Sequence, residues 1–227
     1  MRVIAGTARG RPLKAPRGQA TRPTSDRVRE ALFSSIAAHV PGATVLDLFA
    51  GSGALGIEAL SRGAGFAVFV DDDQRAVRAI TENLAVARMR ARSRVVRVSA
   101  IRFCADPGAA LGGAPAAAKP PANHPPAHHP PAPPFDIVLC DPPYALALSC
   151  ALSLLEDLGR AAALRPHALV VIERDRRDIG LAEPMPASFE HLRDRRYGDT
   201  VLRYARLAQE PVLTDHDAGA AGEEPAE

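Results

Sequence analysis

The chain has 227 residues, 47% of them apolar, which supports one domain with a sizeable core and does not require two. Its cysteines, Cys104, Cys140 and Cys150, form no C-x-x-C pair and are too few for a disulfide framework, so we expect a protein of the reducing cytoplasm. No apolar run reaches the roughly 18 residues that a membrane span needs, and the N-terminal residues show no secretory signal pattern. A membrane protein and a disulfide-stapled secreted module are therefore not expected.

The net charge of +2 at pH 7 hides an uneven distribution along the chain. Eight Lys or Arg residues and a single acid lie within the first 29 residues, whereas the last 13 hold five acids and neither Lys nor Arg. The basic arm favours a polyanionic partner, although a solvated charged surface is the commoner meaning of a charge cluster by itself. The acidic segment 209–227 is rich in Ala and Gly, and we expect it to be a disordered tail.

The first 40 residues form a small basic extension in this interpretation. Residues 2–14 are expected to make a short hairpin, with two glycines available for its turns. Thr24 or Ser25 can cap a helix that runs to about His39, and Pro41-Gly42 ends that helix.

From residue 41 to residue 208, strand patterns alternate with helix patterns. The predicted strands are Thr44–Phe49, Phe66–Val70, Val95–Val98, Phe135–Cys140 and Leu169–Glu173. The predicted helices are Leu55–Arg62, Asp73–Arg90, Ala100–Leu111 and Leu146–Ala162. This alternation predicts an α/β fold with a doubly wound, mostly parallel sheet. Near the C-terminus, Glu190–Arg195 and Thr200–Arg206 flank Tyr197-Gly198-Asp199, which predicts an antiparallel hairpin added to the sheet.

Residues 113–134 interrupt this pattern inside the domain. Nine of these 22 positions are Pro and seven are Ala, so the segment has almost nothing to bury and is expected to be a disordered insertion. It also holds His124, His128 and His129. A flexible Pro-rich loop does not hold ligand geometry, and we therefore expect no metal site.

A glycine turn follows the first strand of the domain. Gly51 and Gly53 satisfy G-x-G-x-x-G between a strand and a helix, where the backbone can approach a nucleotide closely. Asp71 ends the next strand, 20 residues after Gly51, where an acid can bind both ribose hydroxyls. NAD and S-adenosylmethionine both fit this pattern. Asp47, just before the turn, favours S-adenosylmethionine, because it suits the methionine ammonium and would repel a pyrophosphate.

The fourth strand leads directly into Asp141-Pro142-Pro143-Tyr144. Ligands of an open α/β sheet bind beyond the carboxyl ends of its strands, so this motif is expected beside the glycine turn. The prolines supply no N–H donors, which leaves the Asp141 carboxylate and the Pro142 carbonyl as acceptors for the hydrogens of a base amine. Tyr144 can stack on the base. An ionised Asp can only accept hydrogen bonds. This property favours guanine, whose edge is rich in donors, as the substrate base, and adenine remains an alternative.

With these motifs, the chain resembles the RsmD family, whose members methylate N2 of a guanine in bacterial 16S ribosomal RNA. The resemblance covers about residues 1–112 and 135–208, and its most specific stretch is Arg22-Pro-Thr-Ser-Asp-Arg-Val-Arg-Glu-Ala-Leu-Phe33. Asp47–Arg62, Asp141–Tyr144 and Tyr197–Thr200 are similar to its cofactor loop, catalytic motif and final hairpin. Three features depart from the family: Asp71 stands where Glu is usual, Ser99 stands where some members have Asn, and the insertion precedes the catalytic strand.

The resemblance implies a class I, Rossmann-like methyltransferase fold with S-adenosylmethionine as cofactor. It also implies a cytoplasmic location and a 16S ribosomal RNA substrate within small-subunit particles, and we expect a monomer. Ser99 and Ala100 fall near the expected adenine contact. The arginines expected to bind the RNA are Arg2, Arg9, Arg11, Arg22, Arg27 and Arg29.

Three other functions fit parts of the pattern. A DNA adenine-N6 methyltransferase shares Asp141–Tyr144, but nothing in the sequence resembles a separate target-recognition domain. An NAD-dependent oxidoreductase leaves that motif and the basic arm unexplained. A non-enzymatic nucleic-acid-binding protein explains the arm and needs no intact cofactor loop.

Overall fold

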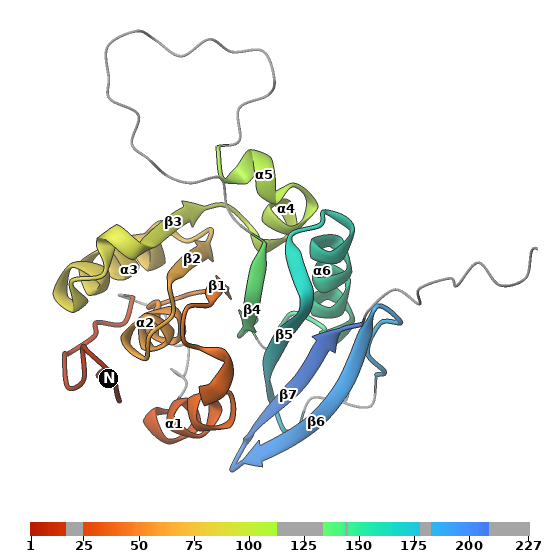
Figure 1. Cartoon of the computed structure of the whole chain (residues 1–227), viewed down its shortest axis with the longest axis horizontal. Coiled ribbons are helices and arrows are strands. Elements are labelled where there is room, and N and C mark those ends of the chain that lie inside the picture. Colours follow the sequence, from red (N-terminus) through yellow and green to blue (C-terminus); the bar gives the residue numbers. More distant parts are fainter. Residues whose placement is uncertain (17–24, 113–133, 144, 178–182, 209–227) are drawn as a thin grey trace, which may run out of the picture.

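A computed structural model describes residues 1–16, 25–112, 134–143, 145–177 and 183–208 of the chain (Figure 1). These residues form one seven-stranded sheet with the strand order β3-β2-β1-β4-β5-β7-β6. The strands are β1 (Thr44–Leu48), β2 (Phe66–Asp71), β3 (Ser93–Arg97), β4 (Phe135–Cys140), β5 (Leu164–Asp175), β6 (Phe189–Tyr197) and β7 (Thr200–Leu207). The first five are parallel, and β7 and β6 join them as an antiparallel hairpin. The predicted doubly wound sheet with a C-terminal hairpin is confirmed.

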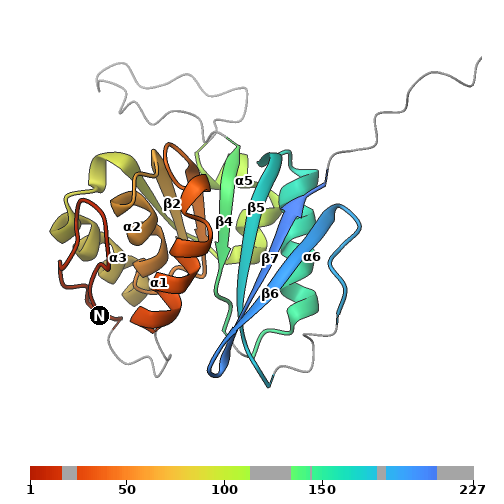
Figure 2. The same ribbon diagram turned by 60° about the horizontal axis from the view of Figure 1, so that its bottom comes forward.

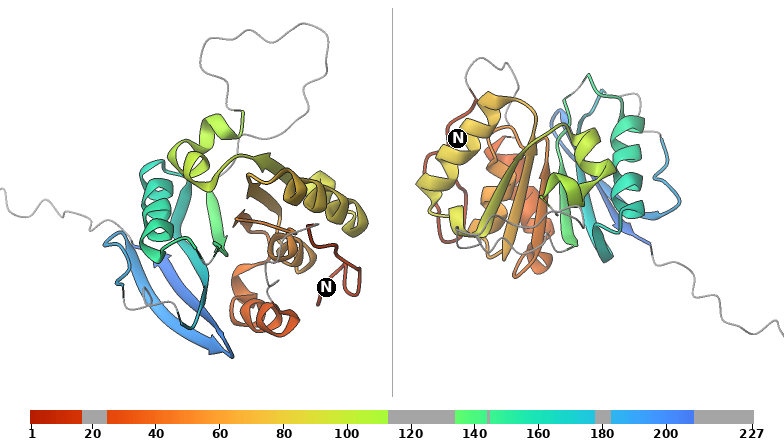
Figure 3. Two further views of the ribbon diagram at one scale, coloured as in Figure 1. Left: turned by 180° about the vertical axis from the view of Figure 1, so that it is seen from behind. Right: turned by 90° about the horizontal axis from the view of Figure 1, so that it is seen from above.

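Helices cover both faces of the sheet (Figure 3). They are α1 (Asp26–Ser35), α2 (Ala54–Ser61), α3 (Gln74–Ala87), α4 (Ala100–Ala105), α5 (Pro107–Ala110) and α6 (Leu148–Arg160). Short 3₁₀ turns follow α1 (η1, Ala37–His39) and α3 (η2, Arg90–Arg92). Leu32, Phe33 and Ile57 belong to the core between the sheet and helices α1–α3, and Phe103 and Leu155 belong to the core on the opposite face.

Two predicted helices differ from the structure by more than three residues at one end or by a break. The predicted helix Ala100–Leu111 breaks into α4 and α5, because Pro107 cannot continue a helix and Asp106 caps the new one by accepting from the Ala109 amide. The helix expected to reach His39 ends at Ser35 and continues only as a 3₁₀ turn. Its predicted cap is correct, since the Ser25 hydroxyl accepts from the Val28 amide.

The N-terminal hairpin is also confirmed. Arg2 pairs with Pro12 in an antiparallel bridge, and the Gly10 amide donates to the Val3 carbonyl at 2.9 Å. Gly6 has φ +79°, and a Cβ there would lie 1.8 Å from the Ser61 carbonyl oxygen. The hairpin is therefore pressed against α2 at a point where only glycine fits.

The sheet has a carboxyl edge, where parallel strands end, and an opposite amino edge. Residue Pro134 immediately precedes β4, so the insertion rejoins the described chain at the amino edge. β7 runs antiparallel to β5, and Ala208 therefore also lies toward the amino edge. The segments 113–134 and 209–227 that were predicted to be disordered lie outside the described residues, apart from Pro134.

Deletion of residues 114–133, with a short Gly/Ser loop in their place, is expected to leave turnover within about threefold of the parent value. A change in the length of a connecting segment costs little in closure entropy, and this segment is followed by Pro134, which lies away from the carboxyl edge. Steady-state methylation and thermal unfolding of the two proteins test this. A collapse of turnover with an unchanged melting temperature would show that the insertion contacts substrate or cofactor.

Candidate active site

The glycine turn between β1 and α2 requires its glycines for different reasons. Gly51 has φ +54° and Gly53 has φ +75°, a region that other residues rarely adopt. A Cβ on Gly53 would also press on Ile80 and Phe69 at 3.2–3.3 Å, whereas beside Gly51 the nearest atom would be 3.9 Å away. The backbone at Gly51 is therefore open to a ligand, and the backbone at Gly53 is closed against the core.

Asp47 lies beneath this turn and is only 1% exposed. The Gly56 amide donates to its Oδ2 at 2.8 Å and thereby ties the first turn of α2 to β1. Burial raises the pKa of Asp47 well above its usual range, against the effect of that hydrogen bond, and the charges of Asp141 and Asp71 raise it further. The sequence placed Asp47 at a cofactor ammonium; that contact stays a prediction, and the tie to Gly56 is an additional role.

Asp71 reaches the turn from the end of β2. Its Oδ2 accepts from the Gly51 amide at 2.8 Å, and its Oδ1 accepts from the Asp73 amide at 2.9 Å. Burial raises the pKa of Asp71, and these two hydrogen bonds oppose the shift. The side chain is half-buried, so it both holds the open glycine and borders the surface where the ribose of a nucleoside is expected.

The Asp141-Pro142-Pro143 segment leaves the sheet next to the end of β1. The Asp141 amide donates to the Leu48 carbonyl at 3.5 Å, and Asp141 is close enough to Asp47 to raise its pKa. Pro142 is buried and Pro143 is exposed. The expected juxtaposition of this motif with the glycine turn is therefore observed for these three residues. Tyr144 lies outside the described residues, and its stacking role stays a prediction.

Two further residues predicted to touch the cofactor follow β3. Ser99 caps α4, because its Oγ accepts from the Arg102 amide at 3.3 Å, and Ala100 is buried. The Val98 amide donates to the Asp71 carbonyl at 3.2 Å, which brings the start of α4 to the same edge as Asp71. Contact of Ser99 and Ala100 with an adenine stays a prediction.

Comparison with known proteins places the chain among methyltransferases. The family described as Conserved hypothetical protein 95 matches residues 1–110 and 122–206. Ribosomal RNA small subunit methyltransferase D of Escherichia coli (strain K12) is 36% identical over 211 residues, which cover 92% of this chain and 91% of that protein. The chain belongs to the RsmD family.

Other relatives support the RsmD assignment. YlbH of Bacillus subtilis (strain 168), a proposed rRNA methyltransferase, is 48% identical over 102 residues. These residues make up 45% of this chain and 55% of that protein. The solved structure of the Escherichia coli protein yhhF, a proposed methyltransferase, has a TM-score of 0.70 at 33% identity and covers 92% of this chain and 99% of that one. The predicted class I, Rossmann-like methyltransferase fold is thereby confirmed.

Most of the arginines expected to bind RNA in this RsmD protein lie at the surface. Arg2, Arg9 and Arg27 are exposed, and the half-buried Arg11 donates to the Val86 carbonyl of α3. Arg22 lies outside the described residues. RNA contact by these residues stays a prediction.

The position of Arg29 differs from the one predicted from the sequence. It is completely buried, and its Nη2 donates to the Arg2 carbonyl at 2.5 Å and to Asp26 Oδ1 at 2.9 Å, while its Nε lies 3.8 Å from Glu58 Oε2. A guanidinium in this position cannot reach a phosphate, and the assignment of Arg29 to RNA binding is wrong. Arginine is rarely buried without such partners, and the pairing gives Arg29 a structural role.

Two buried residues that the sequence analysis missed fasten the N-terminal hairpin of this RsmD member. The Glu58 carboxylate accepts from the amides of Ile4 and Ala5 at 2.8 and 3.0 Å and from Arg62 Nε at 2.7 Å. A single charged residue in the buried helix Ala54–Ser61 was the signal that could have revealed this site.

Asn83 forms the second attachment. Its Oδ1 accepts from the Lys14 amide at 2.8 Å, and its Nδ2 donates to the carbonyls of Lys14 and Ser52, both at 2.9 Å. Ser52 lies between the two glycines of the turn. One amide side chain therefore connects the basic hairpin to the candidate cofactor loop.

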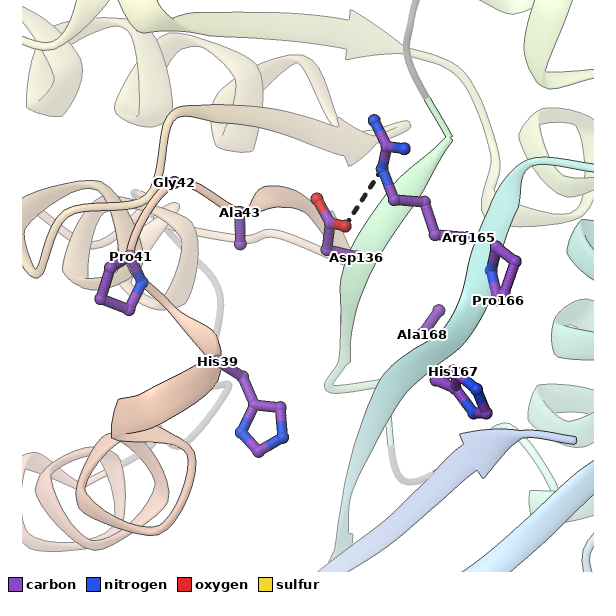
Figure 4. Close-up of a pocket in the computed structure, with 9 residues that line it drawn as sticks. All are labelled: His39, Pro41, Gly42, Ala43, Asp136, Arg165, Pro166, His167 and Ala168. Atoms are coloured by element: carbon purple, nitrogen blue, oxygen red, sulfur yellow. Dashed lines mark ion pairs between the residues drawn. The ribbon is translucent and has the colours of Figure 1, made fainter.

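A surface hollow of about 370 Å³ lies at the amino edge, away from these residues (Figure 4). Asp136 in its wall pairs with Arg165 Nε at 3.1 Å and accepts from the Thr44 amide at 2.8 Å. The Asp136 carboxylate therefore links β4 to β5 and to β1 and already has partners within the protein. Within the described ranges, no group of three or more His, Cys, Asp or Glu residues could hold a metal ion. No helix in that part of the chain is long and apolar enough to cross a membrane.

Proposed function

We propose that this protein transfers the methyl group of S-adenosylmethionine to the exocyclic N2 amine of a guanine in 16S ribosomal RNA, in the cytoplasm. The observation that supports this best is the gathering of Asp47, Asp71 and Asp141 around the glycine turn. Their mutual repulsion suits a cofactor that carries an ammonium and a sulfonium, and it disfavours the pyrophosphate of NAD.

The residues at the carboxyl edge fit that cofactor in distinct ways. Asp71 would accept from the ribose hydroxyls, and the open backbone at Gly51 would allow the methionine part to approach. The Asp47 carboxylate would face the ammonium, whose charge would offset the burial that now raises the pKa of Asp47. The bound cofactor supplies an electrophilic methyl group.

The amine side of the reaction falls to Asp141 and Pro142. A base NH₂ is a weak nucleophile because its lone pair is delocalised into the ring. The Asp141 carboxylate and the Pro142 carbonyl would accept its two hydrogens and turn the lone pair toward the methyl carbon. Formation of the N–C bond would break the methyl–sulfur bond of the bound cofactor, and the nitrogen would then release one proton to solvent. Catalysis of this kind is mainly positioning and electrostatics.

The substrate assignment draws on relatives and on charge. The Escherichia coli relative is named for methylation of small-subunit ribosomal RNA. The exposed arginines of the hairpin, Arg2 and Arg9, would bind phosphates on the α2–α3 side of the molecule. We further propose that the protein acts as a monomer on a small-subunit particle.

Methylation of defined substrates tests the proposal. Radiolabelled S-adenosylmethionine is incubated with the protein and 16S ribosomal RNA, small-subunit particles or duplex DNA, and the product is mapped by mass. A single N2-methylguanine in the ribosomal RNA is expected, in free RNA or in the particle. A methyl group on adenine, or methylation of DNA alone, would contradict the substrate assignment, and failure to bind S-adenosylmethionine would contradict the activity.

Asp71→Ala is expected to weaken S-adenosylmethionine binding about tenfold to a hundredfold. The variant loses charged acceptors, and each hydrogen bond to a charged group contributes on the order of 1.5–3 kcal/mol. Isothermal titration calorimetry measures the change. Asp72→Ala is the matched control, because Asp72 is the exposed neighbour and should leave affinity within about twofold. Equal affinities for the two variants would show that the ribose contact lies elsewhere.

A further inference from the structure

The outer strand β6 is exposed and rich in arginine. Every residue from Glu190 to Arg196 is exposed, and Arg193, Arg195 and Arg196 are among them. The acids of this strand already have partners: Asp194 pairs with Arg203 at 3.1 Å, and Glu190 pairs with Arg206. Within the described ranges, no carboxylate lies within ion-pair distance of the three arginines. β6 therefore carries uncompensated positive charge.

The register of the hairpin divides these arginines between two faces. Arg193 pairs with Tyr204 and Arg195 pairs with Leu202, and both partners belong to the core under α1. Arg196 pairs with Val201, one position along, and so points to the opposite face. Arg193 and Arg195 thus lie about 7 Å apart in a row on the side of the sheet that carries α1.

Arg193 fills the seam between β6 and α1. Its guanidinium lies 4.8 Å from the centre of the Tyr204 ring, and its Nη2 donates to the Ser35 carbonyl at 3.4 Å. The Tyr204 hydroxyl and Ser35 Oγ are 2.8 Å apart, which joins the hairpin to the end of α1. Among the described residues, none anchors Arg195 through a hydrogen bond or ring contact, and Arg195 lies on the same face one step nearer the carboxyl edge.

This row leads to the catalytic edge. Tyr197 ends β6 and pairs with Thr200, which pairs in turn with Asp175 at the end of β5. β4, which leads into Asp141, is three strand spacings from β6, or roughly 14 Å. Figure 2 shows α1 and the β6–β7 hairpin bordering the same edge. The first turn of α1 adds the exposed Arg27 there.

We propose that Arg193, Arg195 and Arg27 form a second RNA-binding surface, which holds phosphates of the substrate strand beside the target guanine. The inference rests on the proposed function and assigns residues outside the N-terminal hairpin. The hairpin is fastened to α2 and α3, whereas this surface lies over α1 and β6, so the two surfaces are neighbours on the side of the sheet that carries α1–α3 (Figure 1). Arginine suits the role, because its planar donor fork matches phosphate oxygens.

The competing explanation is protection of the sheet edge. Charged side chains on an outer strand prevent pairing with a second molecule, and that role needs charge on the strand without regard to face. RNA binding on the α1 side needs Arg195 and not Arg196. The two residues are exposed neighbours on one strand, and they therefore form a matched pair for an experiment.

The test compares Arg195→Gln, Arg196→Gln and Arg195→Lys with the parent protein. Fluorescence anisotropy measures affinity for a labelled 16S ribosomal RNA fragment at several salt concentrations. Arg195→Gln is expected to weaken RNA binding about threefold to tenfold and to make the salt slope shallower by about 0.7–0.9, the value of one phosphate contact. Arg196→Gln should match the parent, and Arg195→Lys should keep the salt slope.

Other readouts separate the proposal from its alternatives. S-adenosylmethionine affinity and kcat at saturating RNA should not change in Arg195→Gln, so that only KM for RNA rises. Equal weakening by Arg195→Gln and Arg196→Gln would overturn the proposal in favour of unspecific charge. Self-association of Arg195→Gln by light scattering with parental RNA affinity would overturn it in favour of edge protection. Methylation by the parent protein is measured separately. Absence of that activity would contradict the proposed function without bearing on the RNA affinities of the variants.

Discussion

Asp141→Asn is expected to lower kcat for guanine methylation by roughly 10²–10³-fold, the usual effect of removing one oriented polar contact to the reacting group. The variant keeps the size of the side chain and replaces one acceptor oxygen with an NH₂ donor, which would face the donors of the guanine edge. Cofactor affinity should stay within about threefold, because Asp47 and Asp71 are unchanged and the hydrogen bonds of Asp141 are expected to go to the base. Single-turnover kinetics and calorimetry separate the two quantities.

Two comparisons sharpen this prediction. Asp141→Ala should be about as damaging as Asp141→Asn if guanine is the substrate, since alanine offers no acceptor and the NH₂ of asparagine would face the donors of the guanine edge. Asp72→Asn removes a charge from the exposed residue that follows β2 and should leave kcat unchanged. Near-parental activity of Asp141→Asn on its natural substrate would contradict the guanine assignment and point to adenine, whose edge tolerates an amide.

Glu58→Ala is expected to cost about 3–5 kcal/mol of unfolding free energy. The completely buried carboxylate balances the buried guanidinium of Arg29 and accepts from two amides of the N-terminal hairpin. Its removal leaves the half-exposed Asp26 as the remaining ion-pair partner of the buried Arg29 and leaves unsatisfied donors in the interior. Urea denaturation measures the loss, and the hairpin is expected to detach at lower urea than the sheet unfolds.

Glu82→Ala is the matched control for Glu58→Ala. Glu82 also attaches the N-terminal segment, through Lys14 Nζ at 2.9 Å, but both side chains are more than half exposed. Exposed ion pairs contribute about 0–1 kcal/mol, so this variant should be nearly as stable as the parent. Similar losses for the two variants would show that the hairpin is held by its apolar contacts and not by the buried carboxylate.

The order of strands and helices could be predicted from the sequence, because each element carries its own hydrophobic period. Lengths were less predictable: β5 begins at Leu164, five residues before the predicted start, since its first part is exposed and lacks a strand pattern. The break between α4 and α5 has a sequence signal in Asp106-Pro107, a capping residue followed by one that cannot continue a helix.

The candidate site was predictable where its residues follow strands, and not where they depend on distant partners. Asp71 and Asp141 could be placed at one edge because parallel strands end together. Arg29 could not be distinguished from the surface arginines around it, because its burial depends on Glu58, 29 positions away. The RNA-facing side of β6 depends on register, and no single-strand pattern indicates register with β7.

The amino edge of the sheet has a practical consequence. Pro134 and Ala208 both lie toward it, so two connections of the chain enter or leave the domain far from Asp141. Fluorescent labels, affinity tags or surface tethers attached there would leave the carboxyl edge open to a particle as large as a ribosomal subunit. Single-molecule measurements of docking could therefore use the amino edge as the handle, with the reacting side of the protein facing solution.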